Sequence, residues 1–209
     1  MFGDRADAGR RLAAHLREYR GAKAVVLGLP RGGVPVAAEV ARALELPLDV
    51  IVVRKLGVPA HPELAMGALG EGGVEVVDWD LVRRARVGPE ELGRVEERER
   101  AVVAARVAEL RGGRPPLDLV GRVAIVVDDG IATGSTAAAA CGVARALGAA
   151  RVVVATPVAP PGLTAAGLDA DELVCVETPW DFQAVGASYD DFTPTTEHEV
   201  VELLTAART

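Results

Sequence analysis

The fold of this 209-residue chain is decided by the stretch Val123-Ala124-Ile125-Val126-Val127-Asp128-Asp129-Gly130-Ile131-Ala132-Thr133-Gly134-Ser135-Thr136. Its opening run of apolar residues, 123–127, predicts a buried parallel strand, and the Ala-rich residues 136–147 predict a helix after it. The loop between them therefore lies at the carboxyl end of a strand. In open α/β sheets this is the edge at which ligands bind.

The composition of this loop is typical of a phosphate site. Small residues let an anion approach backbone N–H groups at the start of a helix, and Thr133, Ser135 and Thr136 add hydroxyl donors. Asp128 and Asp129 repel a phosphate, so we expect them to meet hydroxyl groups or a hard cation. The combination predicts a sugar phosphate as the ligand. The alternative is an Asp-Asp-Gly that only starts a turn and caps a helix.

The stretch resembles the phosphoribosyl pyrophosphate (PRPP) signature of type I phosphoribosyltransferases, of a purine-type or an uncharacterised bacterial branch. The shared features are a hydrophobic strand, two acids and a TGxT turn, here Thr133-Gly134-Ser135-Thr136. The resemblance implies that Asp128 and Asp129 bind the ribose hydroxyls and hold Mg²⁺, directly or through those hydroxyls or water. It assigns the 5′-phosphate to Gly130, Ile131, Ala132, Thr133, Gly134, Ser135 and Thr136.

Hydrophobic patterning along the chain alternates between strand and helix. Strands are expected at 24–27, 49–53, 74–77, 123–127, 151–155 and 172–176. Helices are expected at 4–19, 34–44, 89–111, 136–147, 161–168 and from 196 to about 207. No linker divides the chain, so 1–209 is expected to form a single three-layer α/β/α, Rossmann-like domain. The family resemblance implies a six-stranded sheet of order 3-2-1-4-5-6 with strand 3 antiparallel.

A second loop, Gly28-Leu29-Pro30-Arg31-Gly32-Gly33, places glycines around an arginine just before a helix. These features suit an anion held by backbone N–H groups and a guanidinium, although on their own they fit a tight turn equally well. In the strand order above, this loop lies beside the PRPP loop, where the sheet connections change direction. The matching loop of the family holds pyrophosphate. This role therefore falls on Pro30, Arg31, Gly32 and Gly33.

Arg54 and Lys55, at the end of the second expected strand, form a third candidate anion site for the pyrophosphate. Lysine occurs only at Lys23 and Lys55, so this lysine stands out in an arginine-rich chain. A solvated pair at a strand end is the alternative. In related enzymes an Arg-Lys pair precedes a loop that closes over PRPP, which implies that 56–73 is a mobile lid.

Most of the few aromatic residues gather after the last strand, in a C-terminal acceptor or cover region, 178–209. Trp180, Phe182 and Tyr189 could form a flat slot for a planar base, or could pack as a cover over the sheet. Residues 182–189 loosely resemble a segment of hypoxanthine-guanine phosphoribosyltransferases. Those enzymes place a lysine upstream of it to recognise a 6-oxo group. No lysine follows Lys55, so purine specificity is not implied.

Composition and charge limit the partners. The formal net charge of −7 gives no general attraction to nucleic acid or to an anionic membrane. Charges interrupt the apolar positions of residues 1–21, so we expect neither a signal peptide nor a membrane span, and a cytoplasmic location. Cys141 and Cys175 lack partners at metal-ligand spacing and are expected to be buried free thiols.

The resemblance implies a pentosyltransferase of nucleotide salvage, acting as a Mg²⁺-dependent homodimer. It would transfer the 5-phosphoribosyl group from PRPP to a nitrogenous, nucleobase-like acceptor and release pyrophosphate, with Asp128, Asp129, Arg31 and Lys55 as catalytic residues. Such catalysis relies on positioning and electrostatics, because charge separates between the ribose and the leaving group. One alternative is a regulatory protein that senses PRPP without turning it over. A Mg²⁺-dependent phosphatase or receiver-like domain is disfavoured, because the strand 151–155 leads into Ala155-Thr156-Pro157 without a cation.

Overall fold

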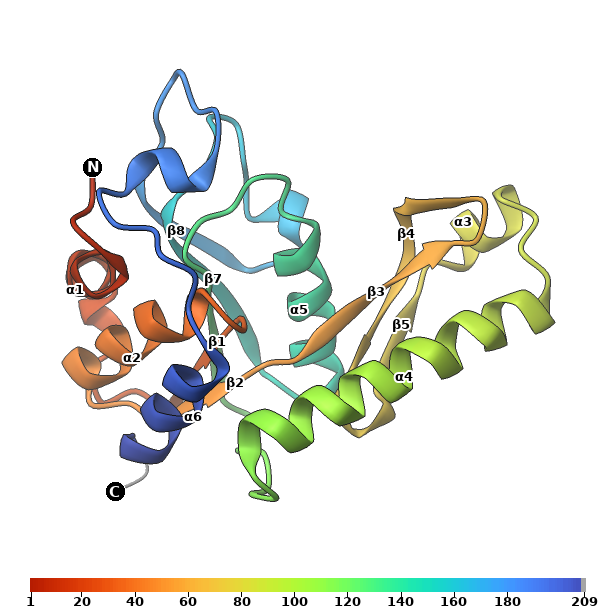
Figure 1. The fold of residues 1–209 in the computed structure, drawn as a ribbon, viewed down its shortest axis with the longest axis horizontal. Helices are drawn as coiled ribbons and strands as arrows, with labels where there is room; N and C mark the ends of the chain where they lie inside the picture. Colours follow the sequence, from red (N-terminus) through yellow and green to blue (C-terminus); the bar gives the residue numbers. More distant parts are fainter. Residues whose placement is uncertain (208–209) are drawn as a thin grey trace.

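A five-stranded parallel sheet of order β2-β1-β6-β7-β8 forms the centre of the computed structural model, which describes residues 1–207 (Figure 1). Its strands are β1 (Ala24–Gly28), β2 (Leu48–Val50), β6 (Val123–Val127), β7 (Arg151–Val158) and β8 (Glu172–Glu177). Because both faces are covered, β1, β2 and most of β6 and β7 are buried along their length. Burial on both faces explains why β1 and β6 are continuous apolar runs in the sequence.

Helices cover the two faces of this sheet. On one face, Val26, Ile125 and Val153 pack with α1 (Arg5–His15), α2 (Gly33–Leu44) and α6 (Glu197–Ala206). On the other face, the alternate residues Val25, Val126 and Val154 pack with α5 (Ser135–Ala146). The expected three-layer α/β/α build is confirmed.

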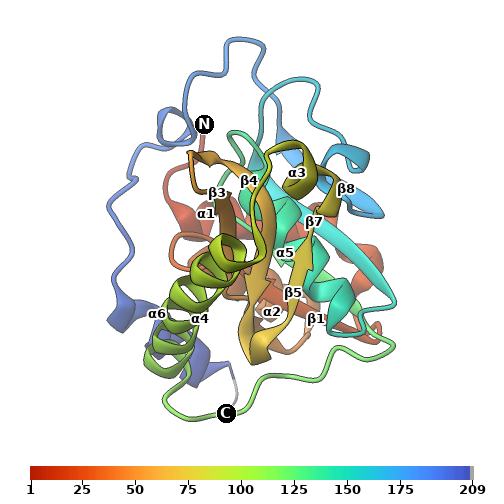
Figure 2. The ribbon, with the colours of Figure 1, turned by 90° about the vertical axis from the view of Figure 1, so that its right-hand side faces the viewer.

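A second, antiparallel sheet of order β3-β4-β5 stands beside the main one. It consists of β3 (Val53–Val58), β4 (His61–Gly70) and β5 (Glu75–Val77), and is followed by α3 (Trp79–Arg84) and the long α4 (Pro89–Arg111). β3 begins soon after β2 ends, so the chain runs from one sheet directly into the other. Figure 1 shows the β3–β4 hairpin and α4 projecting together from the main body, and Figure 2, viewed from that side, shows them in front of it.

Two expectations need correction here. The order 3-2-1-4-5-6 holds for five strands, but the expected strand 74–77 forms β5 in the second sheet and does not join the edge of the main one. The segment 56–73, expected as a loop, forms most of a β-hairpin and a short 3₁₀ turn, Glu71–Gly73. Its glycines serve close strand contacts: a Cβ at Gly67 would lie 2.4 Å from the Val76 carbonyl oxygen. Whether the hairpin moves as a lid stays a prediction.

Most helix ends lie where capping residues in the sequence predicted them. Asp4 caps α1 by accepting from the Asp7 N–H, Pro89 begins α4, and Thr196 and Glu199 form a capping box at α6. Gly112 ends α4 with a positive φ of 56°. The expected helix 4–19 divides into α1 and the 3₁₀ turn Arg17–Tyr19, and the expected helix 161–168 shortens to the 3₁₀ turn Ala166–Leu168.

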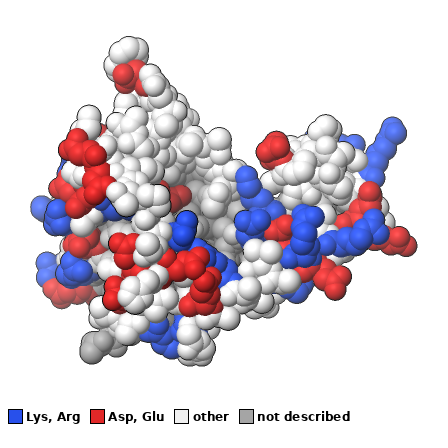
Figure 3. Space-filling view, viewed as in Figure 1, with Lys and Arg blue, Asp and Glu red and all other residues white. Residues whose placement is uncertain are grey.

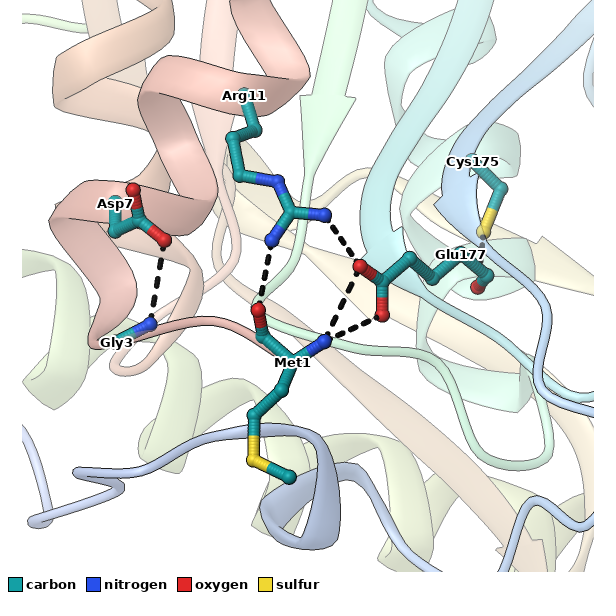
Figure 4. A network of polar contacts seen from close by, with 6 residues as sticks. All are labelled: Met1, Gly3, Asp7, Arg11, Cys175 and Glu177. Carbon is teal, nitrogen blue, oxygen red and sulfur yellow. Dashed lines mark hydrogen bonds and ion pairs between the residues drawn. The ribbon is translucent and has the colours of Figure 1, made fainter.

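The start of α1 is fastened to the end of β8, as Figure 4 shows. The Met1 amino group lies 3.1 Å from a carboxylate oxygen of Glu177, and Arg11 pairs with the same carboxylate while donating to the Met1 carbonyl (2.8 Å). Phe2 is fully buried, and its backbone exchanges hydrogen bonds with Ser188 and Asp190. These contacts hold the first turn of α1 against the C-terminal segment.

A buried ion cluster joins the main sheet to the hairpin and α4. Arg111, 2% exposed at the end of α4, donates through Nη2 to Glu71 Oε1 (2.7 Å) and to the Val50 carbonyl (2.9 Å). Its Nη1 lies 3.3 Å from Asp49 Oδ2, which also accepts from the Leu117 N–H (2.8 Å). Burial raises the pKa of Glu71, and the charge of Arg111 opposes that rise.

Replacing Arg111 by Met should lower the free energy of unfolding by about 3–5 kcal/mol, because two buried carboxylates lose their counter-charge. Urea unfolding followed by circular dichroism measures this change. The matched control is Arg83→Met on α3, which removes an exposed pair with Asp80 and should cost about 1 kcal/mol or less. Equal losses for the two variants would contradict a structural role for the cluster.

Candidate active site

The loop between β6 and α5 has the backbone expected of an anion site. Gly134 precedes α5 with a φ of +78°, and a Cβ there would meet the Leu168 side chain at 2.6 Å, so both conformation and space require glycine. Among residues 1–207, no side chain caps this helix, which leaves its first N–H groups to a ligand. The Thr133 and Ser135 hydroxyl oxygens lie 3.2 Å apart at the start of α5.

Two of the residues expected to bind the 5′-phosphate, Ile131 and Gly130, have structural roles in the loop. Ile131 is buried and donates its N–H to the Val158 carbonyl (2.9 Å), so that N–H is already engaged. A Cβ at Gly130 would come within 2.2 Å of the Val185 side chain, so this glycine permits close packing of the 3₁₀ turn Val185–Ser188. Ala132, Thr133 and Thr136 are exposed, as ligand-binding positions require.

The two loops expected to bind PRPP lie against each other. The loop before α2 contains one cis peptide bond, between Pro30 and Arg31, and the Leu29 N–H bonds to the Val127 carbonyl (2.9 Å). A Cβ at Gly32 would lie 2.0 Å from a carboxylate oxygen of Asp129, and one at Gly33 would lie 2.5 Å from the Val127 carbonyl. Glycine at both positions therefore lets the loops touch. The expected proximity of the loops is confirmed.

Asp129 is held by an arginine that the sequence analysis did not single out. The Arg5 Nε lies 2.8 Å from Asp129 Oδ2, and the two side chains are 11% and 14% exposed. Arg5 also donates to the Thr193 carbonyl (2.7 Å) and lies 4.0 Å from the centre of the Phe192 ring. Tyr189 donates to the Asp129 carbonyl (2.6 Å). Both ends of the chain thus fix this acid, and no local motif signals a contact across so many residues.

The carboxyl groups of Asp128 and Asp129 have different surroundings. Asp128 is half-buried beside Asp129, and its Oδ1 accepts the Asp129 N–H (2.9 Å). Burial, followed by the charge of Asp129, raises the pKa of Asp128 to about 7, while Arg5 opposes the rise. At neutral pH, Asp128 is therefore protonated in part of the molecules. A ligand that donates hydroxyl protons or brings a cation favours the ionised form of Asp128.

The three cations expected at the pyrophosphate have different partners. Lys55 Nζ lies 3.2 Å from Ser135 Oγ, in the expected 5′-phosphate loop, so its assignment to pyrophosphate alone is not supported by this contact. Arg54 Nε donates to Glu99 on α4 (2.9 Å). Arg31 is exposed. The pKa of Glu197 on α6 is lowered mainly by the hydrogen bonds of Glu197 with Glu109 and Arg106, and the charge of Arg31 adds a smaller contribution.

A cavity of about 730 Å³ opens between the loops, the hairpin and α4. Pro30 and Thr136 from the two loops line it, together with Arg54 and Lys55 from β3. A second cavity of about 330 Å³ also has Pro30, Arg54 and Thr136 in its wall and adds Arg106 of α4. Figure 3 shows Lys and Arg gathered where the hairpin and α4 meet the main body. The candidate site therefore extends toward the second sheet.

The aromatic residues do not form one slot for a base. Tyr189 is buried, with its ring between Phe2 (centroids 5.4 Å apart) and Phe192 (4.9 Å). Phe182 packs in the same cluster, whereas Trp180 is 88% exposed. Of the two interpretations, the cover is the one that the structure supports for Tyr189 and Phe182, because their surfaces are used in packing.

The two cysteines, His61 and Glu63 lie outside the contacts described above. Cys141 is buried and Cys175 half-buried, and both are free thiols; burial raises the pKa of Cys141 to about 12. His61 and Glu63 are exposed on β4. In the described part of the chain, no three His, Cys, Asp or Glu side chains gather into a metal site.

A family model described as the phosphoribosyl transferase domain matches residues 3–191. The chain belongs to this family. It is 53% identical over 209 residues to the Mycobacterium tuberculosis (strain H37Rv) protein Rv0571c, named as a provisional phosphoribosyl transferase. That match covers 99% of this chain and 47% of the relative, so the chain spans about half the length of the curated relatives it matches. Among solved structures, TT1426 from Thermus thermophilus is 45% identical, with a TM-score of 0.90 over 99% of this chain and 98% of that one.

Replacing Arg5 by Gln should raise the pKa of Asp128 above about 7, because the neighbouring Asp129 loses its counter-charge and Arg5 no longer opposes the rise. Carboxyl ¹³C NMR titration measures the shift. Arg10→Gln, which removes an exposed pair with Asp7 on the same helix, is the control and should leave the titration in place. An unchanged or lowered Asp128 pKa in Arg5→Gln would show that Arg5 does not act on this pair.

Proposed function

We propose that the chain transfers the 5-phosphoribosyl group of PRPP to a nitrogenous acceptor and releases pyrophosphate. The observation that carries the proposal is the contact between the two loops, with Gly32 against the Asp129 carboxylate. A ribose whose hydroxyls meet Asp128 and Asp129 then has the start of α5 available for its 5′-phosphate. The loop before α2 is available for its pyrophosphate. Family membership supports the same assignment.

The proposed reaction needs the charges that surround this point. As the bond from ribose C1 to pyrophosphate breaks, positive charge builds on the ring and negative charge on the leaving group. Asp128 and Asp129 lie where carboxylates offset the ring charge. Arg31 and the uncapped start of α2 lie where donors offset the charge of pyrophosphate. Lys55, at Ser135, serves the 5′-phosphate end in this arrangement.

Mg²⁺ fits this site as a partner of the substrate. Mg²⁺ prefers oxygen ligands, keeps several waters and commonly binds one or two carboxylates together with substrate phosphates. Asp128 and Asp129 supply such a pair: Arg5 engages one oxygen of Asp129 and the Asp129 N–H engages one oxygen of Asp128, so each acid keeps a second oxygen for the cation. When bound, Mg²⁺ would neutralise charge on the pyrophosphate. We therefore keep Mg²⁺ dependence as part of the proposal.

Several finer expectations stay predictions: the nucleobase nature of the acceptor, the role in nucleotide salvage, the homodimer and the cytoplasmic location. Within residues 1–207, the longest and most apolar helices still fall short of what a membrane crossing needs. The acceptor is nitrogenous in this proposal because the reaction class joins ribose C1 to a nitrogen.

PRPP with Mg²⁺ should raise the melting temperature with increasing ligand concentration, because it binds the folded chain only. Coupled detection of pyrophosphate, with a panel of nitrogenous bases, then tests turnover. Asp128→Asn/Asp129→Asn should abolish the ligand-induced shift while the variant still folds, since both acids follow the end of β6. No shift at millimolar PRPP would refute the proposal. Binding without turnover of any base would favour the PRPP sensor.

Lys55→Ala should weaken ribose 5-phosphate and PRPP alike, by about tenfold or more, because a charge-assisted hydrogen bond contributes roughly 1.5–3 kcal/mol. Parallel calorimetric titrations with the two ligands and with inorganic pyrophosphate measure the change. The other lysine of the chain offers the control: Lys23→Ala removes the same charge away from the site and should leave all three affinities unchanged. A loss of affinity confined to PRPP and pyrophosphate would show instead that Lys55 binds the pyrophosphate end of PRPP.

A further inference from the structure

One buried carboxylate on α4 holds two arginines side by side at the wall of the large cavity. Glu99 is 7% exposed; its Oε2 accepts from Arg54 Nε (2.9 Å) and its Oε1 from Arg98 Nε (3.0 Å). Both arginines and Glu99 line the cavity. A guanidinium has five N–H donors, and among residues 1–207 these two make no further hydrogen bond, so their Nη groups stay available.

The same wall carries more positive charge than its acids can neutralise. Arg94 lies one turn before Arg98 on α4, is exposed, and has no hydrogen bond or ion pair within the described residues. Lys55 adds a fourth cation. The acids in the lining are Glu99, already shared by two arginines, and Glu91, whose Oε2 accepts the Gly88 N–H (3.1 Å) at the start of α4. The cavity therefore attracts an anion.

The proposed sites for PRPP account for Lys55 but not for the charge of Arg94 and Arg98. The pyrophosphate loop contributes Pro30 to the cavity lining, and the 5′-phosphate loop contributes Thr136, whereas Arg94 and Arg98 belong to α4. The volume of about 730 Å³ lies in the range of small-molecule sites. Apolar surface of Val53, Val58 and Pro62 lies in the same lining and suits a ring. A molecule here can meet the PRPP loops at one end and the arginines at another.

We propose that this cavity is the acceptor site and that the acceptor carries an oxyanion, a carboxylate or a phosphate, bound by Arg94 and Arg98. The inference rests on the proposed function, because it assigns the second substrate of that reaction. Arginine suits this role, since its planar guanidinium meets carboxylate and phosphate oxygens through paired hydrogen bonds. Glu99 is a positioning residue that orients Arg54 and Arg98.

Inorganic phosphate is the first probe, titrated by calorimetry into the whole chain saturated with PRPP and Mg²⁺. The wild-type protein should bind phosphate in addition to PRPP. Arg94→Ala/Arg98→Ala should weaken that phosphate binding by about tenfold or more and change PRPP affinity less than about twofold. Both positions are exposed on a helix, and Glu99 keeps Arg54. The matched control is Arg83→Ala/Arg84→Ala, which removes two exposed arginines from α3 and should leave both affinities intact.

Acceptor pairs that differ by one carboxylate are the second probe, with nicotinate set against nicotinamide and orotate against uracil. Pyrophosphate release at saturating PRPP should favour the acidic member of a productive pair, and Arg94→Ala/Arg98→Ala should remove that preference. Turnover of neutral members that the double variant leaves unchanged would overturn the inference while supporting the proposed function.

Two binding results would also overturn the inference. The first is a PRPP-saturated protein that takes no phosphate. The second is a double variant that loses PRPP as strongly as phosphate, because the arginines would then belong to the PRPP site. Failure of the proposed function is distinct from both: the free chain would bind phosphate through Arg94 and Arg98 but would not bind PRPP at all.

Discussion

Arg111 is the side chain on which the relation between the two sheets depends. A guanidinium that is 2% exposed must have its charge compensated inside the protein, and Asp49 of β2 and Glu71 at the end of the hairpin provide this compensation. The cluster therefore fixes where the hairpin leaves the main sheet and where α4 returns to it. The same strand and helix, β3 and α4, line the large cavity.

The strand geometry of β3 explains why two neighbouring cations have separate tasks. Successive residues of a strand point to opposite faces, so Arg54 reaches Glu99 on α4 while Lys55 reaches Ser135 on α5. In a loop, as the sequence suggested for the residues just beyond them, both side chains could turn toward one pyrophosphate. In the hairpin each side chain has its own partner, and both still line the large cavity, whose wall from β3 and α4 is cationic.

Features encoded within a few residues could be predicted from the sequence. Strands buried on both faces, such as β1 and β6, are continuous apolar runs, so the sequence predicted these strands and the two neighbouring loops that follow them, the candidate ligand loops within 123–136 and 28–33. The hairpin was not predicted, because a segment with glycine and proline at close strand contacts has the composition of a loop. The contacts of Arg5 with Asp129 and of Arg111 with Asp49 join distant residues. An arginine-rich chain offers many equivalent partners for each acid, so sequence alone could not select these pairs.

The distribution of charge determines how such a chain can bind an anion. With a formal net charge of −7, the whole molecule does not attract anionic ligands over long distances. Affinity must come from donors close to the ligand, and the structure concentrates them: two uncapped helix starts among the described residues, and the cations of β3 and α4. Nearby groups also set the charge of the two acids in the site. Arg5 neutralises Asp129, and burial beside Asp129 leaves Asp128 with a pKa of about 7. A ligand that donates hydroxyl protons or brings a cation then meets one carboxyl group paired with Arg5 and one, that of Asp128, whose ionised form it favours.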